Sequence, residues 1–181
     1  MSQPQTPKPA KLVISLFMKE QGLILPVAKT LEEKFGPVDM ASPWLPFNFT
    51  MYYDKEMGAP LFRKILVFKT LIDQDTLAEI KIFTNDLELE YSKNSKRMVN
   101  LDPGYMLQER FVLATGKNYS HRIYIGKYIY ADLTLIYTKD EFQTLPWTYP
   151  DYAEKNMLTF LGKVRNKYVA DLKQISREHG Y

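Results

Sequence analysis

Two helical segments, each following a short apolar run, constrain the fold of this chain more than any other feature of the sequence. The first run, residues 11–18, is typical of a buried strand. A helix is expected from about Leu25, because apolar residues then recur every four positions until the Gly36-Pro37 pair ends the helix. A second strand-like run, 61–71, precedes a helix that the same periodicity predicts over 73–92.

Two less regular segments complete this first part of the chain. Residues 38–53 are extended and contain prolines, and residues 98–100 are expected to form a short strand that ends in a tight turn at Asp102-Pro103-Gly104. The order is then strand, helix, strand, strand, helix, strand. This order is the βαββαβ pattern of ferredoxin-like domains.

A β-hairpin is expected next, because strand-like residues 120–125 and 128–137 flank the pair Gly126-Lys127. Glycine at the first central position suits a two-residue type II′ turn. In that register His121 faces Asp132, whereas the side chain of Arg122 points to the other face.

Capping boxes are expected at two helix starts. Thr76 pairs with Glu79 in the first, and Asp151 pairs with Glu154 at the start of a long final helix. An apolar stripe on this last helix should close the core; its members are Ala153, Met157, Phe160, Val164, Tyr168 and Leu172. We therefore expect a single α+β domain over 10–181, with a ferredoxin-like first part, an antiparallel hairpin and a closing C-terminal helix.

Composition excludes several classes of protein. The chain has no cysteine, so disulfides, thiolate zinc sites and a cysteine nucleophile are excluded, and His121 and His179 are too few for a multi-histidine zinc site. No window approaches the roughly 20 apolar residues of a membrane span. Residues 1–9 are polar, contain three prolines and resemble a disordered tail rather than a signal peptide. A cytoplasmic location is the expectation.

A phosphate-binding P-loop is absent. Gly116-Lys117 resembles the end of such a loop, but Phe111 stands where the loop needs glycine and Asn118 stands where it needs serine or threonine. Glycines let backbone amides surround a phosphate, so their absence argues against P-loop nucleotide hydrolysis.

His121 and Asp132 form the strongest candidate catalytic pair. A carboxylate facing a histidine can fix its tautomer, as a general acid or base requires. The alternative is an ordinary cross-strand pair on the protein surface.

Polar groups also gather in two other segments. Asn100, Asp102 and Tyr105 place an amide, a carboxylate and a phenol around the expected turn. Asp54 and Glu56 lie in a loop crowded with aromatic residues and could join Asp102 or Asp132 around Mg²⁺, although the spacing does not require a metal. We predict no metal site and no cofactor.

A basic, aromatic stretch suggests a second kind of binding. Its members are Lys93, Lys96, Arg97, Arg110, Lys117, Arg122 and Lys127, interleaved with Tyr119, Tyr124 and Tyr128. Cations beside stacking rings can bind a nucleotide or single-stranded RNA, and they can equally form a solvated face. The net charge of +3 does not distinguish a nucleic-acid-binding surface from a solvated one.

Four segments together resemble a known family. They are Phe-Thr-x-Tyr-Tyr-x-x-Glu-Met-Gly at 49–58, Val-Asn-Leu-Asp-Pro-Gly-Tyr at 99–105, Ser-His-Arg-Ile-Tyr-x-Gly-Lys at 120–127 and Leu-Pro-Trp-Thr-Tyr-Pro-Asp-Tyr at 145–152. In this order they resemble an uncharacterised prokaryotic family, domain of unknown function 4416. Some members carry the label "GTP-binding protein", but this sequence has neither the guanine-reading Asn-Lys-x-Asp motif nor an Asp-x-x-Gly switch.

The resemblance implies that polar and aromatic residues of these segments converge on one pocket. The residues concerned are Tyr53, Glu56, Asn100, Asp102, Tyr105, His121, Arg122, Trp147 and Tyr149. The expected function is binding or transformation of a small anionic ligand such as a nucleotide or phosphorylated metabolite.

In that hypothesis Arg122 and Lys127 neutralise charge, Tyr105 and Trp147 stack on the ligand, and His121 moves protons with Asp132 or Asp102. The alternative is a non-catalytic module that docks RNA or protein. Whether the chain is an enzyme stays open at this stage.

Overall fold

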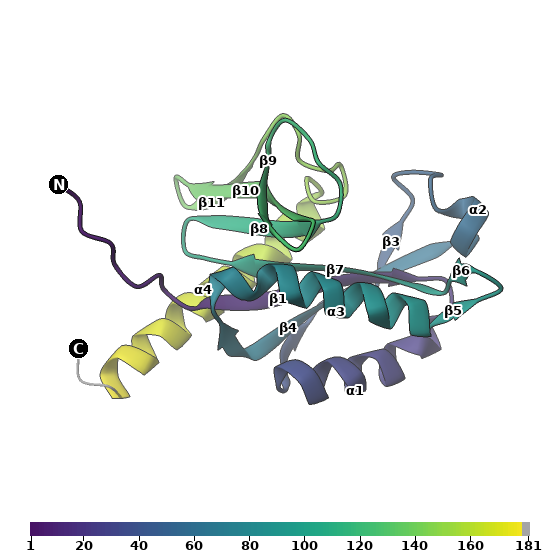
Figure 1. Cartoon of the computed structure of the whole chain (residues 1–181), viewed down its shortest axis with the longest axis horizontal. Helices are drawn as coiled ribbons and strands as arrows, with labels where there is room; N and C mark the ends of the chain where they lie inside the picture. The colour runs from purple at the N-terminus through teal and green to yellow at the C-terminus, as the bar shows by residue number, and fades with distance from the viewer. Residues whose placement is uncertain (179–181) are drawn as a thin grey trace.

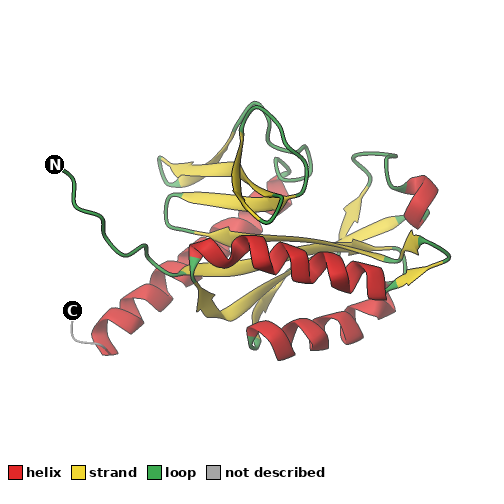
Figure 2. Cartoon of the chain, viewed as in Figure 1, coloured by secondary structure: helices red, strands yellow, loops and turns green. Residues whose placement is uncertain are grey.

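The computed structural model describes residues 1–178, in which a nine-stranded antiparallel sheet is flanked by helices (Figures 1 and 2). Its strands are β1 (Ala10–Met18), β2 (Val38–Ala41), β3 (Leu45–Phe47), β4 (Leu61–Ile72), β7 (Val99–Met106), β8 (Arg110–Thr115), β9 (Arg122–Gly126), β10 (Ile129–Thr138) and β11 (Glu141–Thr144). A separate ribbon joins β5 (Ser92–Lys93) and β6 (Lys96–Arg97). The main helices are α1 (Ile24–Phe35), α3 (Leu77–Glu90) and α4 (Lys155–Glu178), and α2 (Asp54–Met57) is short. His179 lies outside the described residues.

Strand β1 lies inside the sheet, between β7 and β4, and is buried along its whole length. The strand order is β11-β10-β8-β7-β1-β4-β2, with β3 paired to β4 and β9 paired to β10. Leu12, Leu16 and the other side chains on one face of β1 pack against α1 and α3. Val13 faces the opposite side, where α4 covers the sheet (Figure 1). The chain is therefore a mixed α+β protein with a large antiparallel sheet and a C-terminal helix.

The predicted turn at Asp102-Pro103-Gly104 is wrong, because these residues lie inside β7. Pro103 pairs with Ile14 of β1, and β8 pairs with β7 only from Gly104 onward. Pro103 thus has a strand partner on one side only, which a residue without an N–H can tolerate. Gly104 serves close packing: a Cβ there would meet the carbonyl oxygen of Val112 at 2.4 Å.

The hairpin of β9 and β10 is present, but its turn lies one residue later than expected. Lys127 and Tyr128 both have positive φ, 52° and 61°, which is the pattern of a type I′ turn. This turn alone would place Asp132 opposite Ile123, but a register shift between Ile129 and Tyr130 pairs Asp132 with Arg122 rather than with His121. This slip brings Arg122 onto the same side as Asp132, and the expectation that its side chain points away is wrong.

Neither predicted capping box forms. Thr76, the residue before α3, makes no side-chain capping hydrogen bond; its hydroxyl instead donates to the carbonyl oxygen of Asp73, across a preceding turn of 3₁₀ helix (Gln74–Thr76). Helix α4 begins at Lys155, four residues after Asp151, and the carboxylate of Asp151 is instead bound by the buried Arg63.

The N-terminal residues 1–9 contain no helix or strand, and residues 1–8 are exposed. The tail still touches the body at its end, where the Tyr168 hydroxyl donates to the carbonyl oxygen of Pro9. Among the described helices, none combines the length and the apolar character that crossing a membrane requires.

Candidate functional site

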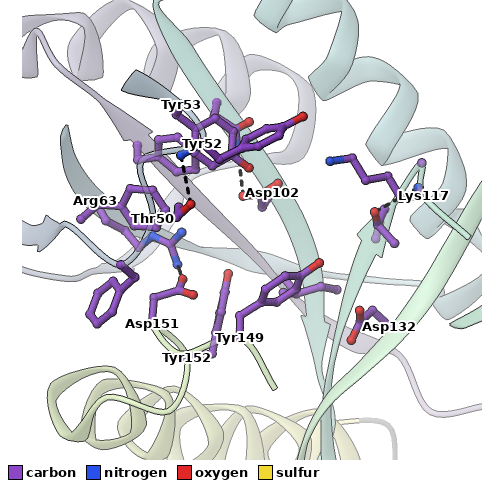
Figure 3. Close-up of a pocket in the computed structure, with 18 of the residues that line it drawn as sticks. Thr50, Tyr52, Tyr53, Arg63, Asp102, Lys117, Asp132, Tyr149, Asp151 and Tyr152 are labelled. Atoms are coloured by element: carbon purple, nitrogen blue, oxygen red, sulfur yellow. Dashed lines mark hydrogen bonds and ion pairs between the residues drawn. The ribbon is translucent and has the colours of Figure 1, made fainter. Parts of the chain in front are cut away.

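A pocket of about 670 Å³ opens between the loop before α2, the middle of β7, the loop after β8 and the segment before α4 (Figure 3). A volume of this size is typical of small-molecule sites. It is lined by Phe17, Phe47, Phe49, Thr50, Tyr52, Tyr53, Arg63, Lys81, Asn85, Arg97, Asn100, Asp102, Leu113, Ala114, Thr115, Gly116, Lys117, Asp132, Tyr149, Pro150, Asp151 and Tyr152.

Packed aromatic rings form one wall of the pocket. Phe17 of β1 stacks on Phe47 of β3, with ring centres 4.4 Å apart, and Tyr53 meets Phe17 edge-on at 4.8 Å. Burial, together with the nearby charge of Asp102, raises the pKa of Tyr53 to about 12. The phenol of Tyr53 is therefore neutral at physiological pH, where it can donate a hydrogen bond.

A buried ion pair lies against this aromatic wall. The guanidinium of Arg63 on β4 donates to the carboxylate of Asp151, and both side chains are almost completely buried. The same guanidinium lies over the rings of Phe47 and Tyr152, 4.6 and 5.1 Å from their centres. Packing on two rings and a carboxylate partner offset the cost of burying this cation.

A hydrogen-bonded network forms a second wall. Arg97 holds Glu56 at 2.6 Å and Glu88 at 2.8 Å, and it also donates to the amide oxygen of Asn100 at 2.9 Å. The amide nitrogen of Asn100 in turn donates to Asp102 at 2.8 Å. The network fixes the side chains of β7 that face the pocket.

Charge and burial act in opposite directions on the two glutamates of the network. The hydrogen bond from Arg97 lowers the pKa of Glu56, which is partly exposed. Burial raises the pKa of Glu88, although Lys81, the amide of Leu101 and Arg97 oppose that effect. Arg97 is thus held by one partly exposed glutamate, Glu56, and one buried glutamate, Glu88.

Lys117 differs from the other cations of the pocket. Arg63 pairs with Asp151, Lys81 lies 3.6 Å from Asp102, and Arg97 pairs with two glutamates. The ammonium of Lys117 lies instead over the Tyr52 ring, 4.8 Å from its centre, and no carboxylate of the described residues is within ion-pair distance. Among residues 1–178, Lys117 is therefore the pocket cation whose charge no carboxylate balances.

Asp132 lines the pocket, and two side chains that lie outside the pocket contact its carboxylate. Nε of Arg122 donates to its Oδ2 at 2.8 Å, and Nε2 of His121 lies 3.2 Å from the same oxygen. The His121 ring stacks on Trp147 with centres 4.8 Å apart and planes 11° apart. Arg122 also donates to the phenol of Tyr149, whose ring faces the pocket. His121 and Arg122 thus position Asp132 and Tyr149.

The structure brings together only part of the predicted site. Tyr53, Asn100, Asp102, Asp132 and Tyr149 line the pocket. Glu56, His121 and Arg122 lie behind it and hold residues that line it.

Three residues predicted to line the pocket or bind its ligand lie elsewhere. Trp147 stacks on His121, and its indole N–H donates to the carbonyl oxygen of Leu133. Tyr105 is buried in a core cluster with Val112 and is no stacking platform. Lys127 is at the hairpin tip and pairs with Glu79 at 3.0 Å.

Sequence reasoning missed several residues of the site. Arg63 lies within an apolar run and Lys81 on a buried helix face, and an isolated charge in such a place signals a buried partner. Asp151 was interpreted as a helix cap. In the sequence, Lys117 stands out only as one member of a basic stretch and as the end of a segment that lacks the other residues of a P-loop.

The structure contains no candidate metal centre among residues 1–178, since no three acidic or histidine side chains there are grouped to hold an ion. Glu56, which was considered as a Mg²⁺ ligand, is bound by Arg97.

Comparison with known proteins gives one match. The model of a family described as "Domain of unknown function (DUF4416)" matches residues 8–168. No curated protein and no solved structure matches the chain.

Proposed function

The chain belongs to the DUF4416 family, and we propose that its pocket binds a small anionic ligand of the nucleotide type. The observation that carries this proposal is the unbalanced charge of Lys117 at the edge of a pocket of about 670 Å³. The ion pairs of the other cations are internal to the protein, so an anion would gain most by approaching Lys117.

Partly exposed rings beside Lys117 support a ligand with a flat ring system. Tyr52 is 66% exposed and Tyr149 is 40% exposed, although both line the pocket. Figure 3 shows Tyr52 and Lys117 on opposite sides of the opening, with Tyr149 below them. Stacking of a base on an aromatic ring stabilises binding by about 1–3 kcal/mol and tolerates any base. A nucleotide would place its phosphate beside the unbalanced charge of Lys117 and its base on one of the partly exposed rings.

Isothermal titration calorimetry tests the proposal directly. The ligands are the four ribonucleoside 5′-monophosphates, with inorganic phosphate to measure the anion alone and the free nucleosides to measure the base and sugar alone. We expect saturable binding of at least one nucleotide and weaker binding of both fragments. If none of the nucleotides binds or raises the melting temperature, the proposal is wrong.

One observation favours a second candidate, a module that docks another macromolecule. Side chains of the β9–β10 hairpin and the loop before it are exposed and apolar; they are Tyr119, Ile123, Tyr124 and Tyr128. Exposed rings beside a lysine suit single-stranded RNA. Titration with labelled RNA oligomers tests this candidate, and a Tyr124→Ser/Tyr128→Ser variant should abolish any binding without affecting nucleotide affinity.

We further propose that β1, α1, β2, β4, α3 and β7 form a ferredoxin-like unit. The order β7-β1-β4-β2 and the packing of α1 and α3 on one apolar cluster support this arrangement. A crystal structure in which these strands follow another order would contradict it.

A further inference from the structure

Asp102 presents an open acceptor to the pocket. Its Oδ2 accepts a hydrogen bond from Asn100, whereas its Oδ1 lies 3.6 Å from the ammonium of Lys81, beyond hydrogen-bond distance. Lys81 donates instead to the carbonyl oxygen of Leu101, at 2.7 Å. Within the described part of the chain, Oδ1 of Asp102 accepts no hydrogen bond. An ionised carboxylate only accepts hydrogen bonds, so this oxygen is suited to a ligand group that donates.

The network behind Asp102 holds the carboxylate in place before any ligand arrives. Asn100 fixes its Oδ2, Arg97 fixes Asn100, and Glu88 fixes both Arg97 and the backbone amide of Leu101, the latter at 2.6 Å. Rotation of Asp102 would break the bond from Asn100. A fixed acceptor needs little reordering on binding and therefore discriminates well between ligands with and without a matching donor.

We infer that Asp102 accepts hydrogen bonds from sugar hydroxyls, so that the pocket is specific for ribonucleotides rather than for any phosphorylated aromatic compound. A carboxylate that faces vicinal hydroxyls is a recurrent way of holding a ribose. The inference rests on the proposed function, because Lys117 and the exposed rings take the phosphate and the base. Asp102 would then contact the sugar, the third part of a nucleotide.

The test compares each ribonucleoside 5′-monophosphate with its 2′,3′-dideoxy counterpart, in the wild-type protein and in Asp102→Asn. Calorimetry gives the dissociation constant of each combination. In the wild type we expect the dideoxy compound to bind about 10- to 100-fold more weakly, since it lacks donors to a charged acceptor. In Asp102→Asn this ratio should fall towards one, because the charged acceptor is gone.

Asp86→Asn is the matched control, since Asp86 is exposed on α3 and the substitution changes the charge equally. It should keep the wild-type ratio. Equal affinity of the wild type for both forms would overturn the inference and leave the proposed function standing. Failure of both forms to bind would instead overturn the proposed function. The wild-type comparison holds even if Asp102→Asn does not fold.

Discussion

The ammonium group of Lys117 lies 4.8 Å from the centre of the Tyr52 ring, across the opening of the pocket. The lysine follows β8 and the tyrosine precedes α2, so the contact joins two loops that reach the pocket from different parts of the sheet. An anion that enters would compete with the ring for the cation.

Lys117→Met should weaken the binding of a nucleoside monophosphate about 10- to 100-fold, because a charge-assisted contact to the phosphate is lost while the unbranched apolar part of the side chain is kept. The free energy of unfolding should change by less than about 0.5 kcal/mol, since the residue is exposed. Calorimetry and urea denaturation measure the two effects. Lys163→Met, an exposed change on α4, is the control, and equal affinity of both variants would contradict the role of Lys117.

The Arg63–Asp151 pair should couple strongly in stability. Asp151→Leu leaves a buried guanidinium without its carboxylate, which typically costs about 3–5 kcal/mol. The double variant Arg63→Met/Asp151→Leu should lose less than the sum of the two single variants, because no buried charge is left unpaired. Urea denaturation of the wild type, the two single variants and the double variant completes this double-mutant cycle. Additive losses of stability would show that the pair is not coupled.

His121→Ala should lower stability more than ligand affinity. The ring is buried against Trp147 and does not line the pocket, and Arg122 still holds Asp132 without it. We expect a loss of about 2 kcal/mol in the free energy of unfolding, and an affinity loss smaller than that of Lys117→Met. An affinity loss as large as that of Lys117→Met would make His121 part of the binding site.

The elements of the fold were largely predictable, because apolar periodicity reports on burial. The strand at β1 and the helix at α1 were expected close to their observed bounds. Asp102-Pro103-Gly104 was misread, since the same residues serve a turn or a strand with one open side. Local sequence cannot distinguish these cases, because β8 supplies the close contact that Gly104 accommodates.

The site was predictable only in part, for a related reason. Asp132 was predicted as the partner of His121 and Asp102 as part of a polar turn, and both line the pocket. Arg63 and Asp151 are far apart in the chain and meet only after β4 and the segment before α4 are packed together. Tyr105 and Trp147 have aromatic rings suited to stacking on a ligand, but Tyr105 is buried in the core and the ring of Trp147 stacks on His121.

Acid should weaken the attachment of α4 to the sheet. Lys11, which is fully buried on β1, pairs with Asp39 on β2 and Asp171 on α4 at 2.8 and 2.6 Å. Burial opposes ionisation of Asp39, but hydrogen bonds and charges of Lys11 and Lys167 outweigh it and lower its pKa below the ordinary value of 3.8. A lowered pKa means that its stabilisation is complete above 3.8 and is lost as the pH falls through the lower, folded-state pKa.

The measurement is the free energy of unfolding of the wild type and of Asp39→Asn, from about pH 6 to about pH 2. The wild type should be more stable at the upper end, and the difference should shrink below the ordinary pKa of 3.8, because a protonated aspartate resembles asparagine. A difference that stays constant over this range would contradict the ionic role of Asp39.

The last prediction tests the contact between β7 and β8, on which the position of the pocket depends. Gly104→Ala should destabilise the protein by about 1–3 kcal/mol, because its Cβ would lie 2.4 Å from the backbone oxygen of Val112 and 2.9 Å from a methyl group of Leu113, which itself lines the pocket.

Gly162→Ala is the matched control: it lies within α4 and a Cβ there meets nothing within 4 Å, so it should stabilise by about 0.5–1 kcal/mol. Thermal and urea denaturation measure both. Because the clash at Gly104 involves backbone, β7 and β8 must move apart to relieve it, and such a movement would displace the loop that carries Lys117 relative to Asp102. Gly104→Ala should therefore also lower nucleotide affinity, whereas equal stability of the two variants would show that the strands are not in this contact.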